Sequence, residues 1–357
     1  MKRLKFALIG CGRIAKRHIE VLKSLDSAEL VAVCDVVAER ARVVGERNGV
    51  RWYVSAEEML ERETPDVVNV LTPSGNHAEM VIRIAGRVRN IIVEKPMALR
   101  LEDADQMIET CDKSKSRLFV VKQNRFNIPV VKLREALERG RFGKLVLGTV
   151  RVRWMRTQEY YDQDPWRGTW SMDGGVFANQ ASHHVDLLSW MMGEVDSVMA
   201  MTATRLVNIE TEDTGVVLLR FKSGALGIVE ATTAARPKDL EGSISILGEK
   251  GTVEIGGFAV NDMKVWSFVE EEEGDREALE KYRTNPPNVY GFGHYEYMRD
   301  AIECILEEKK ALVDGLEGRR SLELINAIYE SVETGREVHM RFKPQKCRLG
   351  MKSQEGR

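Results

Sequence analysis

The stretch Lys5-Phe6-Ala7-Leu8-Ile9-Gly10-Cys11-Gly12-Arg13-Ile14-Ala15 decides the fold of the first part of the chain. Its first five residues predict a short buried strand, and the apolar spacing over residues 19–25 predicts a helix after it. Two glycines and an alanine at this spacing, between a strand and a helix, form the fingerprint of dinucleotide binding. Gly10 allows the tight turn, Gly12 lets the backbone approach a pyrophosphate, and Ala15 lets helix and strand pack closely. The start of the helix then offers backbone amides to phosphate oxygens.

Asp35 stands at the end of a second predicted strand, residues 30–35, about 20 residues after the glycines. A carboxylate here accepts hydrogen bonds from adenosine ribose hydroxyls and repels a 2′-phosphate, so NAD is favoured over NADP. The alternative is an aspartate that only caps a turn at the end of a strand. The strand, the glycines and Asp35 together favour the nucleotide interpretation.

Two further predicted strands end in polar residues. Residues 66–71 lead into Thr72-Pro73, and residues 90–93 lead into Glu94-Lys95-Pro96. Apolar strands that alternate with helical patterns predict a parallel sheet covered on both faces, whose ligands bind at the carboxyl ends of the strands. Lys95 falls there, and a surface lysine at a turn is the alternative. The residues that we expect to bind NAD are Gly10, Gly12, Arg13, Ile14, Asp35, Thr72, Pro73, His77, Glu94, Lys95 and Gln123.

The pattern changes after residue 121. A helix is predicted over residues 129–139, two closing helices over 295–308 and 318–334, and strands over 145–155, 198–205, 214–221, 225–233, 243–247, 252–255 and 264–268. Hairpin turns at 222–224 and 248–251 imply a mostly antiparallel sheet. We therefore expect an α/β Rossmann domain over residues 1–121 and an α+β domain with a large, open, mostly antiparallel sheet over 122–342. Residues 343–357 are predicted to be a disordered tail.

The composition describes an ordinary globular chain of 357 residues. Its 53 lysines and arginines nearly balance its 55 aspartates and glutamates, which argues against binding to nucleic acid or to an acidic membrane surface. No apolar run approaches the roughly 20 residues of a membrane span. The five cysteines are scattered, odd in number and never spaced Cys-x-x-Cys, so we expect reduced thiols and a cytoplasmic protein.

A second signal is the stretch Asp173-Gly174-Gly175-Val176-Phe177-Ala178-Asn179-Gln180-Ala181-Ser182-His183-His184-Val185-Asp186. It combines a glycine pair, an amide, two histidines and a carboxylate ahead of an apolar run, which suggests a lined pocket. Adjacent residues on a helix point about 100° apart, so at most one histidine faces a given pocket. We expect His184 and Asp186 to be structural. The same geometry argues against a metal site built from the two histidines and Asp186.

Together the Gly10 fingerprint, Asp35, Glu94-Lys95-Pro96 and the run from Gly174 to Asp186 resemble the Gfo/Idh/MocA family of nicotinamide-dependent sugar oxidoreductases, over roughly residues 4–342. The resemblance implies a lysine near the nicotinamide, and an aspartate and a histidine four residues apart near the reacting hydroxyl. This chain carries Asn179 in place of that aspartate. Residues 179–184, with 160–163, 166–170 and 290–294, are similar to a subgroup that oxidises UDP-N-acetylglucosaminuronate (UDP-GlcNAcA) at C3 in bacterial surface-polysaccharide pathways.

Oxidation of a secondary alcohol requires a base for the hydroxyl proton and an acceptor for the hydride. Histidine starts near the right pKa, so we assign His183 as the proton acceptor. Lys95 then hydrogen-bonds the same oxygen and stabilises the developing alkoxide, although exchanged roles remain open. Asn179 cannot take up a proton and should position the substrate or the lysine. NAD carries the hydride chemistry.

A UDP-uronate offers anionic groups that suit arginine and flat faces that suit aromatic rings. Each of the candidate arginines, taken alone, is more often a plain surface residue. For Tyr161 and Trp166, packing in the core is an equal alternative. Tyr290 and His294 lie on a glycine-rich loop that is able to close over the nucleotide. The residues that we expect to bind this substrate, besides Asn179, are Arg125, Arg156, Tyr161, Trp166, Arg167, Tyr290 and His294.

The subgroup resemblance also implies that NADH stays bound and is reoxidised in place by a 2-oxo acid such as 2-oxoglutarate. The family resemblance implies a homo-oligomer, a dimer or tetramer. Two other functions remain open. One keeps the chemistry and changes the substrate to a free sugar or inositol, which Asn179 disfavours. The other is a non-catalytic NAD-sensing regulator, which the presence of both Lys95 and His183 disfavours.

Overall fold

The computed structural model describes residues 3–283, 292–341 and 344–352. It divides into two units, which we describe one at a time. The first unit comprises residues 1–122 and 294–319, and the second comprises residues 123–293 and 320–357. Within the described ranges, no helix is long and apolar enough to cross a membrane.

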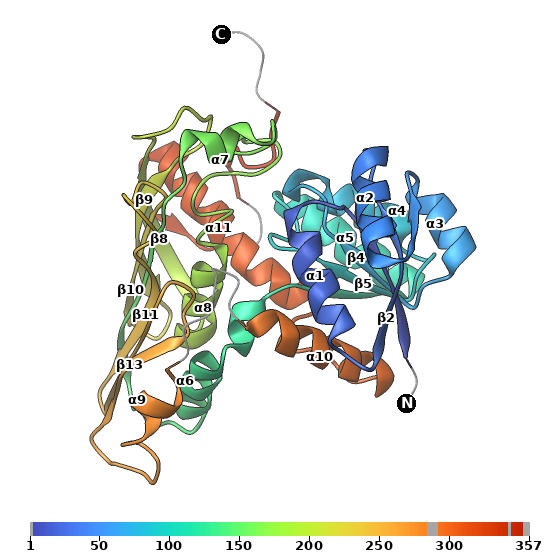
Figure 1. The fold of residues 1–357 in the computed structure, drawn as a ribbon. Helices are drawn as coiled ribbons and strands as arrows, with labels where there is room; N and C mark the ends of the chain where they lie inside the picture. The colour runs from blue at the N-terminus through green and yellow to red at the C-terminus, as the bar shows by residue number, and fades with distance from the viewer. Residues whose placement is uncertain (1–2, 284–291, 342–343, 353–357) are drawn as a thin grey trace. The chain divides into compact units, whose positions relative to one another are not determined.

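The first unit is built on a six-stranded parallel sheet with the order β3-β2-β1-β4-β5-β6 (Figure 1). This is the doubly wound order of a Rossmann fold. Strands β2 and β3 are added on one side of β1, and β4, β5 and β6 are added on its other side, so the switch point lies between β1 and β4. The central strands are buried on both faces, as their continuous apolar runs require. The strands are β1 (Leu4–Ile9), β2 (Ala28–Cys34), β3 (Arg51–Tyr53), β4 (Val67–Val70), β5 (Asn90–Val93) and β6 (Arg117–Val120). The helices are α1 (Arg13–Lys23), α2 (Ala38–Asn48), α3 (Ala56–Glu63), the 3₁₀ turn η1 (Ser74–Asn76), α4 (His77–Ile84), α5 (Leu101–Ser114) and α10 (Gly293–Leu306).

Residues 294–319 belong to the first unit because they pack on its edge strand β6. The guanidinium of Arg117 donates hydrogen bonds to the carbonyls of Cys304, at 2.9 Å, and Lys309. The backbone N–H of Val120 donates to the Val313 carbonyl at 3.2 Å. We expected these residues in the second domain, because they follow its strands along the chain. The structure divides the chain differently, and local sequence patterns carry no trace of this pairing with β6.

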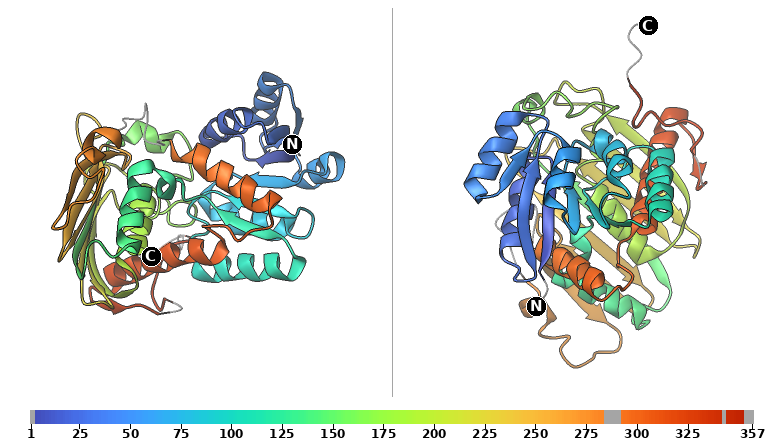
Figure 2. Two further views of the ribbon diagram at one scale, coloured as in Figure 1. Left: turned by 90° about the horizontal axis from the view of Figure 1, so that it is seen from below. Right: turned by 90° about the vertical axis from the view of Figure 1, so that its right-hand side faces the viewer.

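The second unit is built on an eight-stranded sheet with the order β13-β12-β11-β7-β10-β9-β8-β14. Helices α6, α8 and α11 lie against one of its faces (Figures 1 and 2). The strands are β7 (Leu145–Arg153), β8 (Val195–Ala203), β9 (Thr214–Phe221), β10 (Leu226–Thr232), β11 (Glu241–Gly248), β12 (Gly251–Gly256), β13 (Asp262–Phe268) and β14 (Val338–His339). The helices are the 3₁₀ turn η2 (Gln123–Phe126), α6 (Ile128–Glu138), α7 (Gln158–Asp162), α8 (Ser182–Met192), α9 (Ala278–Lys281) and α11 (Gly315–Thr334), which enters this unit from Arg320 onward.

The prediction of a mostly antiparallel sheet is confirmed. The two expected hairpins join β9 to β10 and β11 to β12. One pair departs from the pattern, because β7 and β10 run parallel in the middle of the sheet. Strands β3 and β14 were not predicted, because their three and two residues are too short for a periodic pattern.

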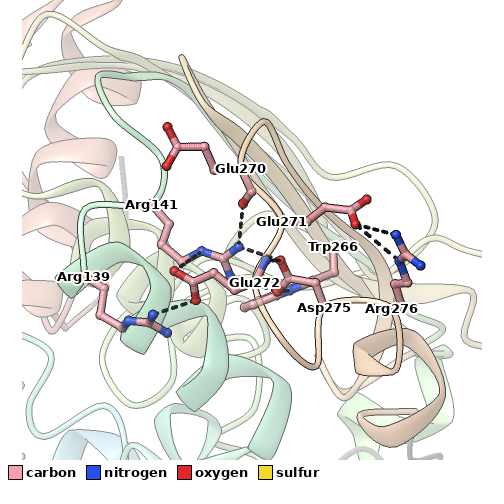
Figure 3. Close-up of polar contacts among 8 residues, drawn as sticks. All are labelled: Arg139, Arg141, Trp266, Glu270, Glu271, Glu272, Asp275 and Arg276. Atoms are coloured by element: carbon pink, nitrogen blue, oxygen red, sulfur yellow. Dashed lines mark hydrogen bonds and ion pairs between the residues drawn. The ribbon is translucent and has the colours of Figure 1, made fainter.

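A cluster of charged residues holds β13 and the segment after it in place (Figure 3). Arg141 donates to both carboxylate oxygens of Asp275, at 2.9 and 2.6 Å, and its guanidinium lies 3.8 Å from the ring centre of Phe268. The indole N–H of Trp266 donates to the same carboxylate at 2.7 Å. The hydrogen bond from Arg141 outweighs burial and holds the pKa of Asp275 below its ordinary value. The charged residues of this cluster therefore have a structural role.

Residues 344–352 pack on the second unit, which differs from the disordered tail that we expected. Leu349 is 1% exposed, and the N–H of Gly350 donates to the Trp170 carbonyl at 2.8 Å. The guanidinium of Arg348 lies 4.4 Å from the ring centre of Trp170. A single leucine in a polar run gave too weak a signal to predict this packing.

Candidate active site

The glycine-rich turn after β1 needs its glycines for two different reasons. Gly10 has a φ of +106°, and a Cβ there would lie 2.5 Å from the carbonyl oxygen of Leu71. Gly12 precedes the first turn of α1, and a Cβ there would meet no protein atom within 4 Å. Ala15 is buried against the sheet. The space over Gly12 and the first amides of α1 is therefore open to a phosphate group.

Asp35 follows β2 and ties the glycine turn to it. Its carboxylate accepts hydrogen bonds from the backbone N–H groups of Cys11 and Val37, both at 2.8 Å. These bonds fix the carboxylate at the edge of the sheet where a ribose would bind. Burial, with the Asp35 charge second, raises the pKa of the Cys11 and Cys34 thiols to about 12. These two thiols are therefore protonated and unsuited to nucleophilic chemistry.

The other residues expected to bind NAD in the first unit gather at the same edge of the sheet. Backbone hydrogen bonds from Gly10 to Cys34 (2.8 Å) and from Glu94 to Val70 (3.0 Å) join the ends of neighbouring strands. Parallel strands bring their carboxyl ends together, so the segment after β5 lies beside the one after β4. Half-buried Lys95 follows β5 directly, and its peptide bond to Pro96 is cis. The turn, the helix start and Asp35 fit a dinucleotide.

His77 differs from its expected role as a cofactor contact. Its ring is 1% exposed, with Nδ1 at 2.7 Å from the Pro96 carbonyl and Nε2 at 2.8 Å from the Thr72 carbonyl. Burial lowers the pKa of the imidazole, although both carbonyl contacts oppose this. A neutral imidazole carries one N–H, so His77 donates to one of these carbonyls and contacts the other, and its ring packs between the loops that carry Thr72 and Lys95.

Glu94 lies in a buried polar cluster that local sequence patterns did not indicate. His18, on the buried face of α1, places Nε2 at 2.8 Å from the Glu94 carboxylate, and Nδ1 at 2.9 Å from the amide nitrogen of Asn69. Burial would raise the pKa of Glu94, but the hydrogen bond and charge of His18, with smaller effects of His294 and Lys95, lower it to about 2. The sequence feature that could have indicated this cluster is His18, a histidine at an apolar position of a helix.

The same cluster brings together three groups that are able to ligate a metal ion. Ligand atoms of His18, Glu94 and His294 all lie within 4.8 Å of one another, and all three residues are buried. Both ring nitrogens of His18 already have polar neighbours, Glu94 and Asn69. This arrangement suits a hydrogen-bonded network that keeps Glu94 ionised next to Lys95. His294 lies here in the first unit, whereas we expected it among the substrate residues.

In the second unit, the glycine pair packs against a buried carboxyl. A Cβ on Gly175 would lie 2.1 Å from Oε2 of Glu212. Oε1 of Glu212 accepts hydrogen bonds from the Phe177 N–H at 3.1 Å and the Tyr329 hydroxyl at 2.8 Å. Burial raises the pKa of Glu212 to about 7, despite these hydrogen bonds. Only glycine fits at 175, and the segment leading to His183 is thereby fixed.

Asn179 lies in the turn before α8, and His183 lies in the first turn of that helix. Asn179 is partly buried, and its amide Nδ2 donates to Asp173 Oδ1 at 2.5 Å. The Ser182 hydroxyl donates to the Asn179 carbonyl at 2.9 Å, which holds the two residues in one turn. His183 is the second residue of α8 and is 7% exposed. The roles of Asn179 and His183 toward a substrate stay predictions.

His184 and Asp186 are structural, as expected. His184 is fully buried, contacts the indole ring of Trp154 edge-on at 5.8 Å, and burial lowers its pKa to about 3. Asp186 accepts two hydrogen bonds from Arg125, at 2.8 and 2.9 Å. Arg125 is 3% exposed and its guanidinium also lies 4.7 Å from the ring centre of Trp190. Its guanidinium therefore serves this buried ion pair, which corrects its expected role in binding substrate anions.

Most of the remaining predicted substrate residues have contacts within the second unit. Tyr161 is 6% exposed and its hydroxyl lies 3.2 Å from that of Thr233, so it is a core residue, and burial raises its pKa to about 12. Arg167 lies 4.6 Å from the ring centres of both Tyr160 and Trp166, and donates to Asp164 at 3.1 Å.

Arg156 is mostly buried, donates to Asp239 at 3.2 Å, and lies 5.4 Å from the ring centre of Trp154. These contacts hold the guanidinium in place. Gln123 is 5% exposed at the start of the second unit, and its role toward NAD stays a prediction. Tyr290 lies outside the described residues.

Comparison with known proteins finds a family domain in each of the two units. Residues 4–122 match an oxidoreductase family with an NAD-binding Rossmann fold, and residues 130–254 match the GFO/IDH/MocA C-terminal domain. The chain is 31% identical to myo-inositol 2-dehydrogenase of Thermotoga maritima over 349 residues, 94% of this chain and 98% of that protein.

Two similar solved structures carry ligands. The WlbA dehydrogenase from Bordetella pertussis, in complex with NADH and UDP-GlcNAcA, is 45% identical with a TM-score of 0.90, covering 95% of this chain and 98% of that one. The WlbA dehydrogenase from Chromobacterium violaceum, in complex with the same two molecules, is 45% identical with a TM-score of 0.89, covering 96% and 97%.

The family matches cover the glycine turn, Asp35 and Lys95 on one side and the segment from Asp173 to Asp186 on the other. The expected Rossmann fold and the antiparallel second sheet are both present. This chain belongs to the Gfo/Idh/MocA family of NAD-dependent oxidoreductases.

Proposed function

We propose that this enzyme oxidises the C3 hydroxyl of a UDP-linked N-acetylated uronic acid, UDP-GlcNAcA, to the 3-keto sugar with NAD. One observation carries the proposal: a protein whose structure holds NADH and UDP-GlcNAcA is 45% identical over 95% of this chain. The sequence at 179–184 supports it, because Asn179 stands where the wider family resemblance implies aspartate.

In this proposal His183 accepts the hydroxyl proton, because a neutral imidazole is a base near the pH of the cell. Lys95 donates a hydrogen bond to the same oxygen, and its charge stabilises the alkoxide as the proton leaves. Asn179 positions the sugar without exchanging a proton. Bound NAD supplies the hydride acceptor, which the side chains of the chain do not.

An inositol or a free sugar is the second candidate substrate. The 31% identity to a myo-inositol 2-dehydrogenase favours it, as does a 27% identity over 356 residues to a D-apiose dehydrogenase of Paraburkholderia graminis. These substrates lack the diphosphate and the nucleobase. If the site fits UDP-GlcNAcA, we therefore expect the KM for inositol or a free sugar to be much higher than the KM for UDP-GlcNAcA.

The test is a substrate panel of UDP-GlcNAcA, UDP-glucuronate, UDP-N-acetylglucosamine, myo-inositol and free aldoses, followed by the absorbance of reduced nicotinamide. We expect a signal with UDP-GlcNAcA, and a loss of on the order of 100-fold or more in kcat for His183→Ala and for Lys95→Met. Lys113→Met is the control, because Lys113 is an exposed lysine paired with Glu109. A panel in which inositol alone reduces NAD would replace the proposed substrate with the second candidate.

We further propose a cytoplasmic dimer or tetramer, in bacterial surface-polysaccharide synthesis, that keeps NADH bound and reoxidises it with 2-oxoglutarate. The support is the subgroup resemblance of residues 160–170 and 179–184. Purified protein would then carry reduced nicotinamide whose absorbance disappears on addition of 2-oxoglutarate. Protein that is purified without cofactor and turns over on added NAD alone would contradict the recycling step.

A further inference from the structure

Asp173 has both carboxylate oxygens engaged within the second unit. Oδ1 accepts a hydrogen bond from the Asn179 amide at 2.5 Å, and Oδ2 accepts one from the backbone N–H of Gly168 at 2.8 Å. The residue is 1% exposed and directly precedes the glycine pair. The N–H of Asn179 also donates to the Gly175 carbonyl at 3.0 Å, so backbone and side chain of Asn179 are both held.

This contact decides which atom of the amide faces away from Asp173. An ionised carboxylate only accepts hydrogen bonds, so the amide must present its donor, Nδ2, to Asp173. Oδ1, the acceptor of the amide, then points away from Asp173. Asn179 is thereby set as an acceptor, the same hydrogen-bonding character that a carboxylate would show, but without a charge.

Resting on the proposed function, we propose that Asp173 is a positioning residue that sets Asn179 as a neutral hydrogen-bond acceptor for a sugar hydroxyl. The pair also accounts for the asparagine itself. An aspartate at 179 would place two carboxylates at hydrogen-bonding distance, and such pairs share one proton because both cannot ionise together. A neutral acceptor further avoids repulsion of a substrate that carries a diphosphate and a carboxylate.

The single substitutions make distinct predictions. In Asp173→Asn, the new amide keeps its oxygen for the Gly168 N–H and turns its Nδ2 toward Asn179. Asn179 then rotates its amide and offers a donor to the sugar where it offered an acceptor. We expect KM for UDP-GlcNAcA to rise about 10-fold with a smaller change in kcat, because one buried hydrogen bond is mismatched.

Asn179→Asp is expected to lower kcat/KM and to add a pH dependence that the wild-type enzyme lacks. One shared proton restores the hydrogen bond between the two carboxyls, so activity falls as pH rises and that proton is lost. A residue that only supported the loop would lower stability without changing the shape of the pH profile.

The double variant Asp173→Asn/Asn179→Asp exchanges the two groups. The amide at position 173 would accept from the Gly168 N–H with its oxygen and donate with its nitrogen to the carboxylate at position 179, so the contact re-forms with reversed polarity. We expect its KM to be lower than that of either single variant, and its pH profile to lose the added ionisation. Asp196→Asn is the control for removing one negative charge from this unit, because Asp196 is an exposed partner of His339.

The wild type, the two single variants, the double variant and the control are compared as holoenzymes in three measurements: KM and kcat for UDP-GlcNAcA against pH, NAD titration, and the thermal unfolding midpoint against pH. Support consists of non-additive KM values, unchanged NAD affinity, and an unfolding midpoint of Asn179→Asp that falls as pH rises and is recovered in the double variant. Additive effects in both KM and midpoint, or a wild-type KM in Asp173→Asn, would overturn the proposal. If the wild-type enzyme oxidises no sugar nucleotide, the proposed function fails, and the unfolding midpoints alone still decide whether the pair is coupled.

Discussion

Glu94 in the first unit and Glu212 in the second are both buried, at 7% and 3% exposed, yet the pKa values of their carboxyls move in opposite directions. Burial raises the pKa of both. At Glu94 the hydrogen bond and charge of His18 outweigh burial and lower the pKa to about 2. At Glu212 backbone amides and the Tyr329 hydroxyl oppose burial too weakly, and the pKa is raised to about 7. The partner, rather than the depth, decides whether a buried carboxyl is charged.

The largest expected effect comes from crowding the second of these carboxyls. Gly175→Ala places a Cβ 2.1 Å from Glu212 Oε2, so we expect the free energy of unfolding to fall by about 3 kcal/mol, measured by urea denaturation. Gly224→Ala is the control, because a Cβ there meets nothing within 4 Å and only the φ of +88° is strained, at about 1 kcal/mol. Equal losses for the two variants would show that Glu212 does not pack against Gly175 in this way.

The next effect is the pH dependence of stability, with opposite signs at the two sites. The pKa of Glu212 is raised from 4.5 to about 7 on folding, so its stabilising contribution is complete below pH 4.5 and is lost as pH rises through 7. Glu212→Gln, which mimics the protonated acid, should therefore gain stability relative to wild type between about pH 5 and about pH 8, by up to about 3 kcal/mol. Parallel urea midpoints of the two proteins across that range would refute the raised pKa.

For Glu94 the sign is reversed. Its pKa is lowered from 4.5 to about 2 on folding, so its contribution is present above pH 4.5 and is lost as pH falls toward 2. His18→Leu removes the donor and leaves a buried carboxylate, and we expect a loss of about 2 kcal/mol near neutral pH that shrinks as Glu94 becomes protonated at lower pH. His339→Leu, at an exposed histidine, serves as the control. A loss that is constant with pH would mean that His18 acts through packing alone.

The smallest expected effect tests whether a carboxyl with a lowered pKa stabilises the protein when that carboxyl is exposed to water. A hydrogen bond from Arg42 lowers the pKa of Glu39, but both side chains lie on the exposed face of α2. We expect Glu39→Gln to leave the urea midpoint unchanged within error at all pH values, because water screens such pairs. A measurable loss would show that such a pair stabilises the protein even when it is exposed to water, so that burial is not needed for the effect expected at Glu94.

The sequence predicted the first unit well because its signals are local. Gly10, Gly12 and Asp35 lie within one strand, helix and strand, and their spacing reflects backbone geometry that needs no distant partner. The fingerprint could not show His18 as the partner of Glu94, 76 residues away. A histidine among the apolar positions of α1 was visible, but its partner was not.

The second unit was predictable in its strands and less so in its side chains. The glycine pair was evident at 174–175, while Glu212, the group that excludes a side chain there, lies beyond α8 and β8 in the chain. Arg125 was assigned to substrate because an arginine near a site suits anions, and its buried partner Asp186 is 61 residues away. Ion pairs of this sequence separation leave no local pattern, so single-residue expectations of this kind remained the weakest.

The packed segment 344–352 has a practical consequence for anyone who handles this protein. A Cβ on Gly174 would lie 2.7 Å from Leu349 Cδ1, so the leucine side chain packs against the turn that leads to Asn179 and His183. Limited proteolysis within 344–352, or an affinity tag fused close behind it, would thus loosen the loop that we propose to be catalytic, which lies more than 150 residues away in the chain. Preparations clipped there would bind NAD normally and yet turn over slowly.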